Sequence, residues 1–577
     1  MNLSDEQKDV INAPLEPIAV TACAGSGKTA TAIRRLITIR QKMETSRGRV
    51  VLLSFSNVAV NTFNKGYAQL ASALSDDANR KRVEVDTLDG FFTKHVLRPH
   101  AYRTMGATQA AYLVSGSEPF LNNFRYWPDD SHPLPIKDIK VGMQDGAIFF
   151  FTDARGGVKQ LDSAKALDTI NRLGRTGAYT HDLGRYWVYQ TFLHQPAVLR
   201  ALTARYPQIL VDESQDLGTL HQAILELLID AGVQVSLIGD VNQGIYGFAG
   251  ADGSFLNTYT DRAGVTGYKL TRNYRSLPPI INIANKLCGR DDKPDRQHEK
   301  GGAYFIGYKE SELPKLFESF KAYLDNLGIQ HQDAVILSRG ADRAAVLAGK
   351  TAPPGQGITA MFAEASLLRD QQEHYQECFK IVCRAVVGLL DTPPNRLSSN
   401  LQGTPDETWM LGLRRLLWSF SRNTEIGLPS SALIAGTEWH PKLVRNVKTL
   451  LADIEKTYGL KAVGKLGNKL AKTKLPGLPL AGAVAAQNGG PGIRVETVHQ
   501  VKGESIGAVL FVTKKANVTA LLSGTGDEEG RIGYVAVTRA KNLFWLAVPH
   551  SSLKELRGAL VKAGFIELSI PALIGKS

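Results

Sequence analysis

The sequence contains little cysteine and no long apolar run. Four cysteines, Cys23, Cys288, Cys378 and Cys383, occur among 577 residues, too few for the disulfide framework of a secreted protein. Cys378 and Cys383 also lack the spacing of metal ligands. No apolar run reaches the ~18 residues that span a bilayer, and the polar start MNLSDEQKDV does not resemble a signal peptide. We therefore expect a protein of the reducing cytoplasm that has no membrane partner.

The chain has fewer Asp and Glu residues than Lys and Arg residues, which gives it a net charge of +13. Because phosphate contacts from Lys and Arg carry most non-specific affinity for nucleic acid, the charge favours a polyanionic partner. One stretch, from Lys456 to Gly492, has six lysines and no acidic residue. A flexible solvated connector and a DNA-contacting surface are both open interpretations of it.

A glycine-rich loop follows a short apolar strand in residues 18–29, IAVTACAGSGKT. Its backbone N–H groups can turn toward phosphate oxygens, while Lys28 neutralises phosphate charge and the Thr29 hydroxyl binds Mg²⁺. A helix that starts near Thr29 would direct its positive end at the same anion. Ala22 replaces the usual first glycine, so a strand-to-helix turn without a nucleotide is the alternative. The residues predicted to bind the nucleotide are Ala24, Gly25, Ser26, Gly27, Lys28 and Thr29.

The order of elements predicts an α/β protein with more than one domain. Apolar strands alternate with helical patterns, which indicates parallel sheets with nucleotide sites at the carboxyl ends of their strands. The rhythm is lost between Lys94 and Ala204, where Gln144-Asp145-Gly146 marks a hairpin. The predicted domains are a first core at 1–93 and 205–263 with an insertion at 94–204, and a second core at 264–390 and 491–577 with a helical, basic insertion at 391–490.

Paired carboxylates follow the predicted strand at 208–211. Asp212 and Glu213 would emerge at its carboxyl end, beside the glycine-rich loop. Asp212 suits a carboxylate linked to Mg²⁺, and Glu213 suits a base that positions the attacking water. Two surface carboxylates without a function are the alternative. With the loop in place, we predict an ATP-hydrolysing site.

Four further stretches resemble the motifs of one known family. GDVNQGIYGFAGA lies at residues 239–251, RNYRS at 272–276, VETVHQVKGE at 495–504 and YVAVTRAK at 534–541. In this order they are similar to the motifs of superfamily 1 helicases of the UvrD/Rep/PcrA family. The resemblance implies two RecA-like, parallel-sheet P-loop core domains, each interrupted by an inserted subdomain.

The resemblance also implies roles on the nucleotide side. Gln7 would recognise adenine, and Tyr274 would pack on it. Gln243 would sense the terminal phosphate, and Glu504 would contact the ribose. The second core would add two arginine fingers. The implied catalytic residues are Lys28, Glu213, Gln243, Arg275 and Arg539.

A second set of implied roles concerns DNA. SFSN at residues 54–57 and TLDG at 87–90 resemble family motifs. Asp89 replaces a usual histidine and would repel a DNA backbone. Ala249 stands where arginine is usual, so that one coupling contact is missing or supplied elsewhere. The implied DNA-binding residues are Phe55, Asn57, Thr87, Tyr246, Phe248, His499 and Lys502.

Taken together, the motifs predict an ATP-dependent 3′–5′ single-strand DNA translocase and helicase that uses Mg²⁺. The alternative is a DNA-stimulated ATPase sensor or loading subunit that works with a partner nuclease in repair or phage defence. Its motivation is the short segment between the strands at 334–338 and 493–497. A Gabija-type defence helicase is one form of this alternative, although no motif singles it out.

Overall fold

The computed structural model describes residues 3–74, 77–114, 118–128, 133–153, 158–245, 247, 250–251, 253–297, 300–349, 354–394, 397–403, 407–481 and 492–568. The chain forms two compact units. The first comprises the described residues within 1–116, 123–344 and 492–577, and the second those within 117–122 and 345–491. None of the described helices is long and apolar enough to cross a membrane.

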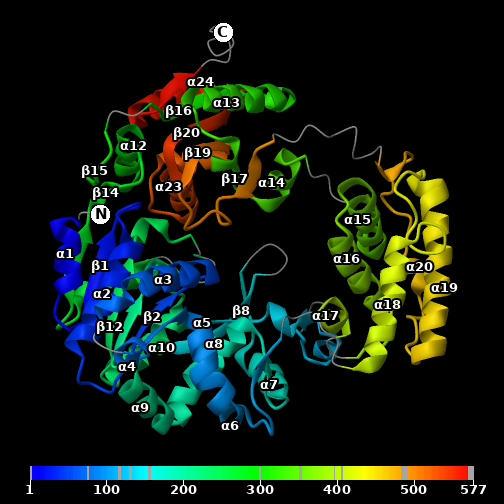
Figure 1. Ribbon diagram of the computed structural model, residues 1–577, viewed down its shortest axis with the longest axis horizontal. Helices are drawn as coiled ribbons and strands as arrows, with labels where there is room; N and C mark the ends of the chain where they lie inside the picture. The colour runs from blue at the N-terminus through cyan, green and yellow to red at the C-terminus, as the bar shows by residue number, and fades with distance from the viewer. Residues whose placement is uncertain are drawn as a thin grey trace. The chain divides into compact units, whose positions relative to one another are not determined.

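A six-stranded parallel sheet forms the first core (Figure 1). Its strands, in spatial order, are β13 (Thr266–Leu270), β1 (Ile18–Ala22), β12 (Gln234–Gly239), β11 (Gln208–Val211), β2 (Val50–Ser54) and β3 (Val83–Thr87). The central strands read as continuous apolar runs because helices cover a parallel sheet. The helices of this core are α1 (Asp5–Asn12), α2 (Lys28–Lys42), α3 (Asn57–Leu70), α4 (Asp77–Arg80), α5 (Leu88–Phe92), α10 (Thr219–Asp230) and α11 (Ser254–Thr258).

Side-chain caps fix where the helices beside the site begin. Ser4 caps α1 in a capping box with Gln7, which satisfies two N–H groups that would otherwise lack partners. Ser56 caps α3, and Thr87 caps α5 through the N–H group of Gly90. The polar residues after β2 and β3 therefore have defined positions at the carboxyl edge of the sheet.

The insertion after α5 contains the predicted hairpin. Strands β7 (Lys140–Gln144) and β8 (Ala147–Thr152) pair antiparallel, and Asp145 and Gly146 take positive φ at the turn. The other strands here are β4 (Tyr112–Leu113), β5 (Arg125–Tyr126), β6 (Leu134–Pro135), β9 (Lys159–Gln160) and β10 (Ala178–Tyr179). The helices are the π-helical segment Thr93–Ala101, α6 (Tyr102–Met105), α7 (Ser163–Gly174), α8 (His181–His194) and α9 (Pro196–Arg205).

The second core is another six-stranded parallel sheet in the same compact unit. Its strands, in spatial order, are β18 (Arg494–Thr497), β17 (Ala334–Ser338), β19 (Ile506–Val512), β20 (Ala540–Pro549), β16 (Gly302–Tyr308) and β21 (Ile566–Leu568). A two-stranded ladder of β14 (Arg272–Asn273) and β15 (Lys293–Pro294) lies near its start. The helices are α12 (Pro278–Cys288), α13 (Leu313–Leu327), α14 (Ala341–Leu347), α22 (Lys515–Leu522), α23 (Glu528–Arg539) and α24 (His550–Ala563).

The second compact unit is helical and has its own core around the buried Trp439. The helices are α15 (Gly357–Gln372), α16 (Tyr375–Val387), α17 (Leu397–Gln402), α18 (Thr408–Arg422), α19 (His440–Tyr458) and α20 (Leu466–Lys469). Leu470 and Leu480 are buried in this core. The described part of the lysine-rich stretch therefore packs on this core at two leucines, while its six lysines are exposed, and both interpretations of it stay open. Residues 482–491 lie outside the described residues.

Two domain boundaries differ from the predicted ones. β13 pairs with β1, so the first sheet extends to Leu270 rather than ending at residue 263. Helices α15 and α16 belong to the helical unit, which begins at 345 rather than 391. Both differences have the same cause. The domain of a strand or helix depends on which elements it packs against, and the local sequence pattern does not indicate those neighbours. The fold class is as predicted, namely two parallel-sheet α/β cores.

Candidate nucleotide site between the two cores

The glycine-rich loop links β1 to α2 and is held from outside by Gln7. Gly25 and Gly27 have φ of 74° and 79°, a region that residues with a side chain rarely adopt. Gln7 Nε2 donates to the carbonyl of Ser26 at 3.1 Å, and a Cβ on Gly27 would lie 2.7 Å from the same nitrogen. The structure thus brings Gln7 against the loop, while Lys28 and Thr29 form the first turn of α2.

The second core touches this loop at Gly25. The backbone N–H of Tyr274 donates to the carbonyl of Gly25 at 2.9 Å. A Cβ on Gly25 would lie 2.5 Å from the Cβ of Arg275 and 2.8 Å from the Oδ1 of Asn273. Glycine is therefore required here for a reason beyond phosphate binding, because the two cores approach each other through it.

Asp212 and Glu213 follow β11 at the carboxyl edge of the sheet. Within the described part of the chain, Asp212 Oδ1 is buried and has no hydrogen-bond partner. Burial, and then the charge of Glu213, raises the pKa of Asp212 to about 8. Burial alone would raise the pKa of Glu213, but the charges of Lys28 and Lys502 outweigh it and lower that pKa. The pair thus contains one carboxyl whose Oδ1 has no hydrogen-bond partner and one that is held ionised, which fits a magnesium ligand beside a base.

Gln243 lies between the two cores. Its Nε2 donates to Asp240 Oδ2 at 3.0 Å, and its Oε1 accepts from Arg539 Nη2 at 2.9 Å. Arg539 also donates to the carbonyl of Glu504 at 3.2 Å. The Gln243 side chain, predicted to sense phosphate, therefore contacts the predicted arginine finger directly.

Arg275 and Arg539 are desolvated. Arg275 Nη1 donates to the carbonyl of Thr538 at 3.0 Å. Burial, and then the charge of Arg539, lowers the pKa of Arg275 to about 9. Burial also lowers the pKa of Arg539. Two cations held close together, Arg539 buried and Arg275 half-buried, favour an anion between them.

Lys502 and His499, predicted to contact DNA, face the first core instead. Lys502 Nζ forms an ion pair with Asp216 at 2.6 Å and donates to the carbonyl of Gln243 at 2.7 Å. His499 Nε2 lies 3.3 Å from the carbonyl oxygen of Ile245. In this arrangement both residues link the cores, and their contact with DNA stays a prediction.

Asp89 does not stand as an isolated negative charge. Arg185 binds both oxygens of its carboxylate, at 3.1 and 2.8 Å, and His221 Nε2 lies 3.1 Å from Oδ1. Burial alone would raise the pKa of Asp89, but hydrogen bonds from His221 and Arg185 lower it. Phe55 packs edge-on against His221, with ring centroids 5.8 Å apart. An arginine from the insertion thus compensates the charge of Asp89, and repulsion of a DNA backbone by Asp89 stays a prediction.

Several other predicted residues lie in the described part of the chain. Thr87 caps α5, and Asn57 is exposed in the first turn of α3. Glu504 forms an exposed ion pair with Arg494 at 2.6 Å, and its contact with a ribose stays a prediction. Tyr246, Phe248 and Ala249 lie outside the described residues.

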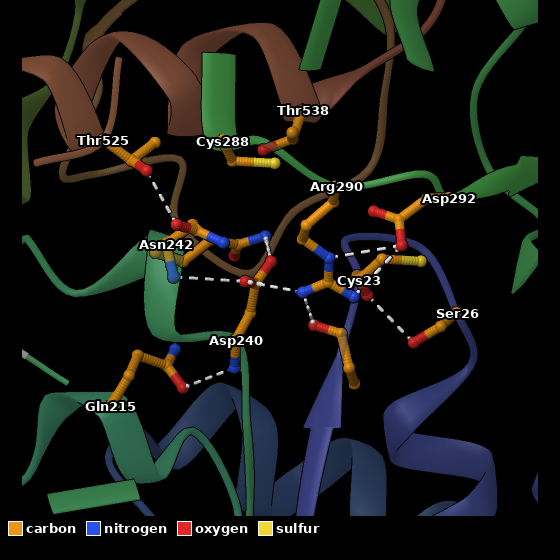
Figure 2. A network of polar contacts seen from close by, with 12 residues as sticks. Cys23, Ser26, Gln215, Asp240, Asn242, Cys288, Arg290, Asp292, Thr525 and Thr538 are labelled. Carbon is orange, nitrogen blue, oxygen red and sulfur yellow. Dashed lines mark hydrogen bonds and ion pairs between the residues drawn. The ribbon is translucent and has the colours of Figure 1, made fainter. Parts of the chain in front are cut away.

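Sequence reasoning missed three charged residues at the site. Asp240 directly follows β12, and this position at the carboxyl end of a neighbouring strand was a usable signal. Arg290 and Asp292 follow α12, and Arg290, which pairs with Asp292, meets Asp240 only in the folded chain (Figure 2). No spacing in the sequence indicates them.

Comparison with known proteins agrees with this geometry. Residues 3–139 and 155–263 match the UvrD/REP helicase N-terminal domain. DNA helicase II of Haemophilus influenzae is 27% identical over 304 residues, which is 50% of this chain and 40% of that protein. ATP-dependent DNA helicase UvrD2 of Mycobacterium tuberculosis is 24% identical over 305 residues, 49% of this chain and 43% of that protein.

A third relative, ATP-dependent DNA helicase PcrA of Leuconostoc citreum, is 23% identical over 308 residues, 50% of this chain and 39% of that protein. The matches thus span less than half the length of these curated relatives. None of the three names refers to phage defence, and that branch stays a prediction. In its first core and in most of the insertion, the chain is thus similar to the N-terminal domain of UvrD/REP helicases.

Proposed function

We propose that the chain is an ATP-driven DNA translocase that moves 3′ to 5′ along one strand and opens duplex DNA. One observation carries the proposal: Arg539 of the second core donates to Gln243 of the first, next to the loop that carries Lys28. A phosphate held by Lys28 would meet positive charge from both cores. Hydrolysis in such a cleft can be coupled to relative motion of the two cores.

Lys28 and the first-turn N–H groups of α2 would bind the outer phosphates. Glu213 would orient and deprotonate the attacking water, since its low pKa keeps it ionised. Arg275 and Arg539 would stabilise the charge that develops on the transferred phosphoryl group. Asp212 and Thr29 would hold Mg²⁺, which neutralises phosphate charge when bound; the unpartnered Oδ1 of Asp212 supports this assignment.

The names of the three relatives support the DNA-dependent part of the proposal, since each is a DNA helicase. The direction of travel rests on the motif resemblance. Phe55 lies at the carboxyl edge of the first sheet, where a base can stack on it. Tyr246 and Phe248 are proposed as further stacking residues from their motif alone.

The test is displacement of a labelled strand from a duplex with a 3′ single-stranded tail. We expect ATP-dependent opening that Lys28→Ala abolishes and that a 5′ tail does not support. Lys515→Ala, which changes an exposed lysine paired with Glu555, is the matched control. ATP turnover that single strands stimulate, with no opening at any protein concentration, would contradict the helicase and favour the sensor that works with a nuclease.

A further inference from the structure

Arg290 is an arginine outside every motif, yet it lies at the nucleotide site. Its side chain is only 16% exposed. Nη1 donates to the carbonyl of Ala22 at 3.3 Å, at the end of β1 and just before the glycine-rich loop. The same nitrogen lies 3.6 Å from Asp240 Oδ1. Figure 2 shows the guanidinium between Asp240 and Asp292, so that one cation faces two carboxylates.

Asp292 holds the other side of Arg290. Arg290 Nε and Nη2 lie 3.2 and 3.1 Å from Asp292 Oδ1. Asn285 of α12 in turn donates to the backbone carbonyl of Asp292 at 3.0 Å and accepts from its N–H at 3.1 Å. The guanidinium is thus anchored to α12 of the second core, while Nη1 reaches the first core.

Asp240 links Arg290 to the residues predicted to be catalytic. It is fully buried, and its Oδ2 accepts from Gln243 Nε2 at 3.0 Å. Gln243 Oε1 accepts from Arg539 at 2.9 Å. The result is a continuous chain of side chains, Arg290–Asp240–Gln243–Arg539, that starts and ends in the second core and crosses the first.

Arg290 lies at a position where little relative motion of the two cores is expected. It lies in the short segment between α12 and β15, and β15 pairs with β14. β14 begins two residues after β13, the edge strand of the first sheet. Arg290 therefore lies beside the segment through which the chain passes from one core to the other. Relative motion of two domains is smallest next to such a connection.

We propose that Arg290 is a positioning residue of the ATP site: it orients Asp240, and through Asp240 it holds the amide of Gln243 toward Arg539. The inference rests on the proposed ATP hydrolysis and adds to it a residue that the motifs do not contain. Without Arg290, the buried carboxylate of Asp240 would lose its cation. Gln243 would then be free to turn its oxygen away from Arg539.

The test measures ATP turnover by the full chain in saturating single-stranded DNA. Arg290→Gln should lower kcat about 10- to 100-fold, as expected for the loss of a charged hydrogen bond, with KM for ATP changed by less than about threefold. Arg290→Lys should recover part of the loss. Arg343→Gln, which breaks an arginine–carboxylate pair with Glu310 in the second core, is the control and should change neither constant.

A double-mutant cycle separates positioning from a general structural effect. In a Gln243→Ala background, Arg290→Gln should cost less than about threefold, because residues in one network are not additive. Wild-type turnover by Arg290→Gln, or a loss that multiplies fully with that of Gln243→Ala, would overturn the inference. Arg290→Lys carries the same cycle if the glutamine variant does not fold.

Failure of the proposed function gives a different result from failure of the role proposed for Arg290. If the wild-type chain does not hydrolyse ATP, that proposal fails, and the inference is read from hydrogen exchange. The N–H of Asn242 donates to Asp240 Oδ1 at 3.2 Å, so Arg290→Lys should speed its exchange. Exchange at Asn242 as slow as in the wild type would overturn the inference.

Discussion

The nucleotide cleft and the Asp89 cluster, formed by Phe55, Asp89, Arg185 and His221, differ in where their motif residues find partners. In the cleft, motif residues contact other motif residues, as Arg539 does with Gln243. In the Asp89 cluster, the motif carboxylate contacts Arg185 of the insertion and His221 of α10. Motifs therefore contain both partners of the Arg539–Gln243 contact, whereas in the Asp89 cluster they contain only Asp89 of its contacts with Arg185 and His221.

The difference has a physical cause. The cleft lies at the carboxyl ends of parallel strands, and sheet topology alone gathers those ends at one edge. The Asp89 cluster depends on which helices pack against that edge. A histidine replaced by a carboxylate is tolerated because Arg185 supplies the positive charge from another element.

The substitution with the largest expected effect alters the candidate nucleotide site and leaves the Asp89 cluster unchanged. Glu213→Gln should lower ATP turnover by about 10²- to 10⁴-fold, because the general base is lost, while ATP binding and strand binding persist. Steady-state turnover and binding of a fluorescent ATP analogue measure both. Glu555→Gln, an exposed carboxylate paired with Lys515, serves as control. Retained turnover would mean that another residue positions the water.

A second substitution alters the Asp89 cluster and leaves the candidate nucleotide site unchanged. Phe55→Ala should weaken binding of a single-stranded oligonucleotide by roughly 1–3 kcal/mol, the cost of one lost base stack, and leave basal ATP turnover nearly unchanged. Fluorescence anisotropy measures the affinity, and a thermal melt controls for lost packing on His221. Equal losses in basal turnover and in strand affinity would remove the distinction between the two regions.

A pH series tests the electrostatics of the cleft. Because the pKa of Asp212 is raised to about 8, a proton competes with the cation below that pH. The apparent affinity for Mg²⁺ should rise up to tenfold per pH unit between about pH 7 and 8 and level off above. The Mg²⁺ dependence of turnover at each pH measures it. Asp212→Asn should remove this slope, and a slope unchanged in that variant points to another group.

The smallest expected effect concerns the stability of the cluster. Asp89→Asn should lower the free energy of unfolding at pH 7 by about 1 kcal/mol, a modest value because the side chain is 34% exposed. The pKa of Asp89 is lowered in the folded state, so this stability is present above the unfolded value of 3.8 and is lost as the pH falls below it. Urea unfolding at pH 7, 5 and 3.5 should show the two proteins converging. A constant difference contradicts the ion pair.

The places of several candidate site residues at strand ends were predictable from sequence, and the reasons are specific. β1 and β11 are apolar runs that end in polar residues, and this pattern predicts that Lys28 and Asp212 lie at one edge of the sheet. Arg290 was not, because its partners, Asp240 and the carbonyl of Ala22, come from distant segments. The compensation of Asp89 by Arg185 was missed for the same reason. Domain boundaries at 263 and 390 failed because β13 joins the first sheet while α15 and α16 pack in the helical unit.

We propose that the two cores together form one ATP site. The most direct measurement is single-turnover ATP hydrolysis, in saturating single-stranded DNA, by Arg539→Ala and by the wild type. If both cores contribute, the variant should hydrolyse ATP on the order of 10²- to 10³-fold more slowly, the cost of losing one preorganised transition-state donor, with ATP still bound. A rate within about threefold of the wild type would contradict it, because the first core would then hydrolyse ATP alone.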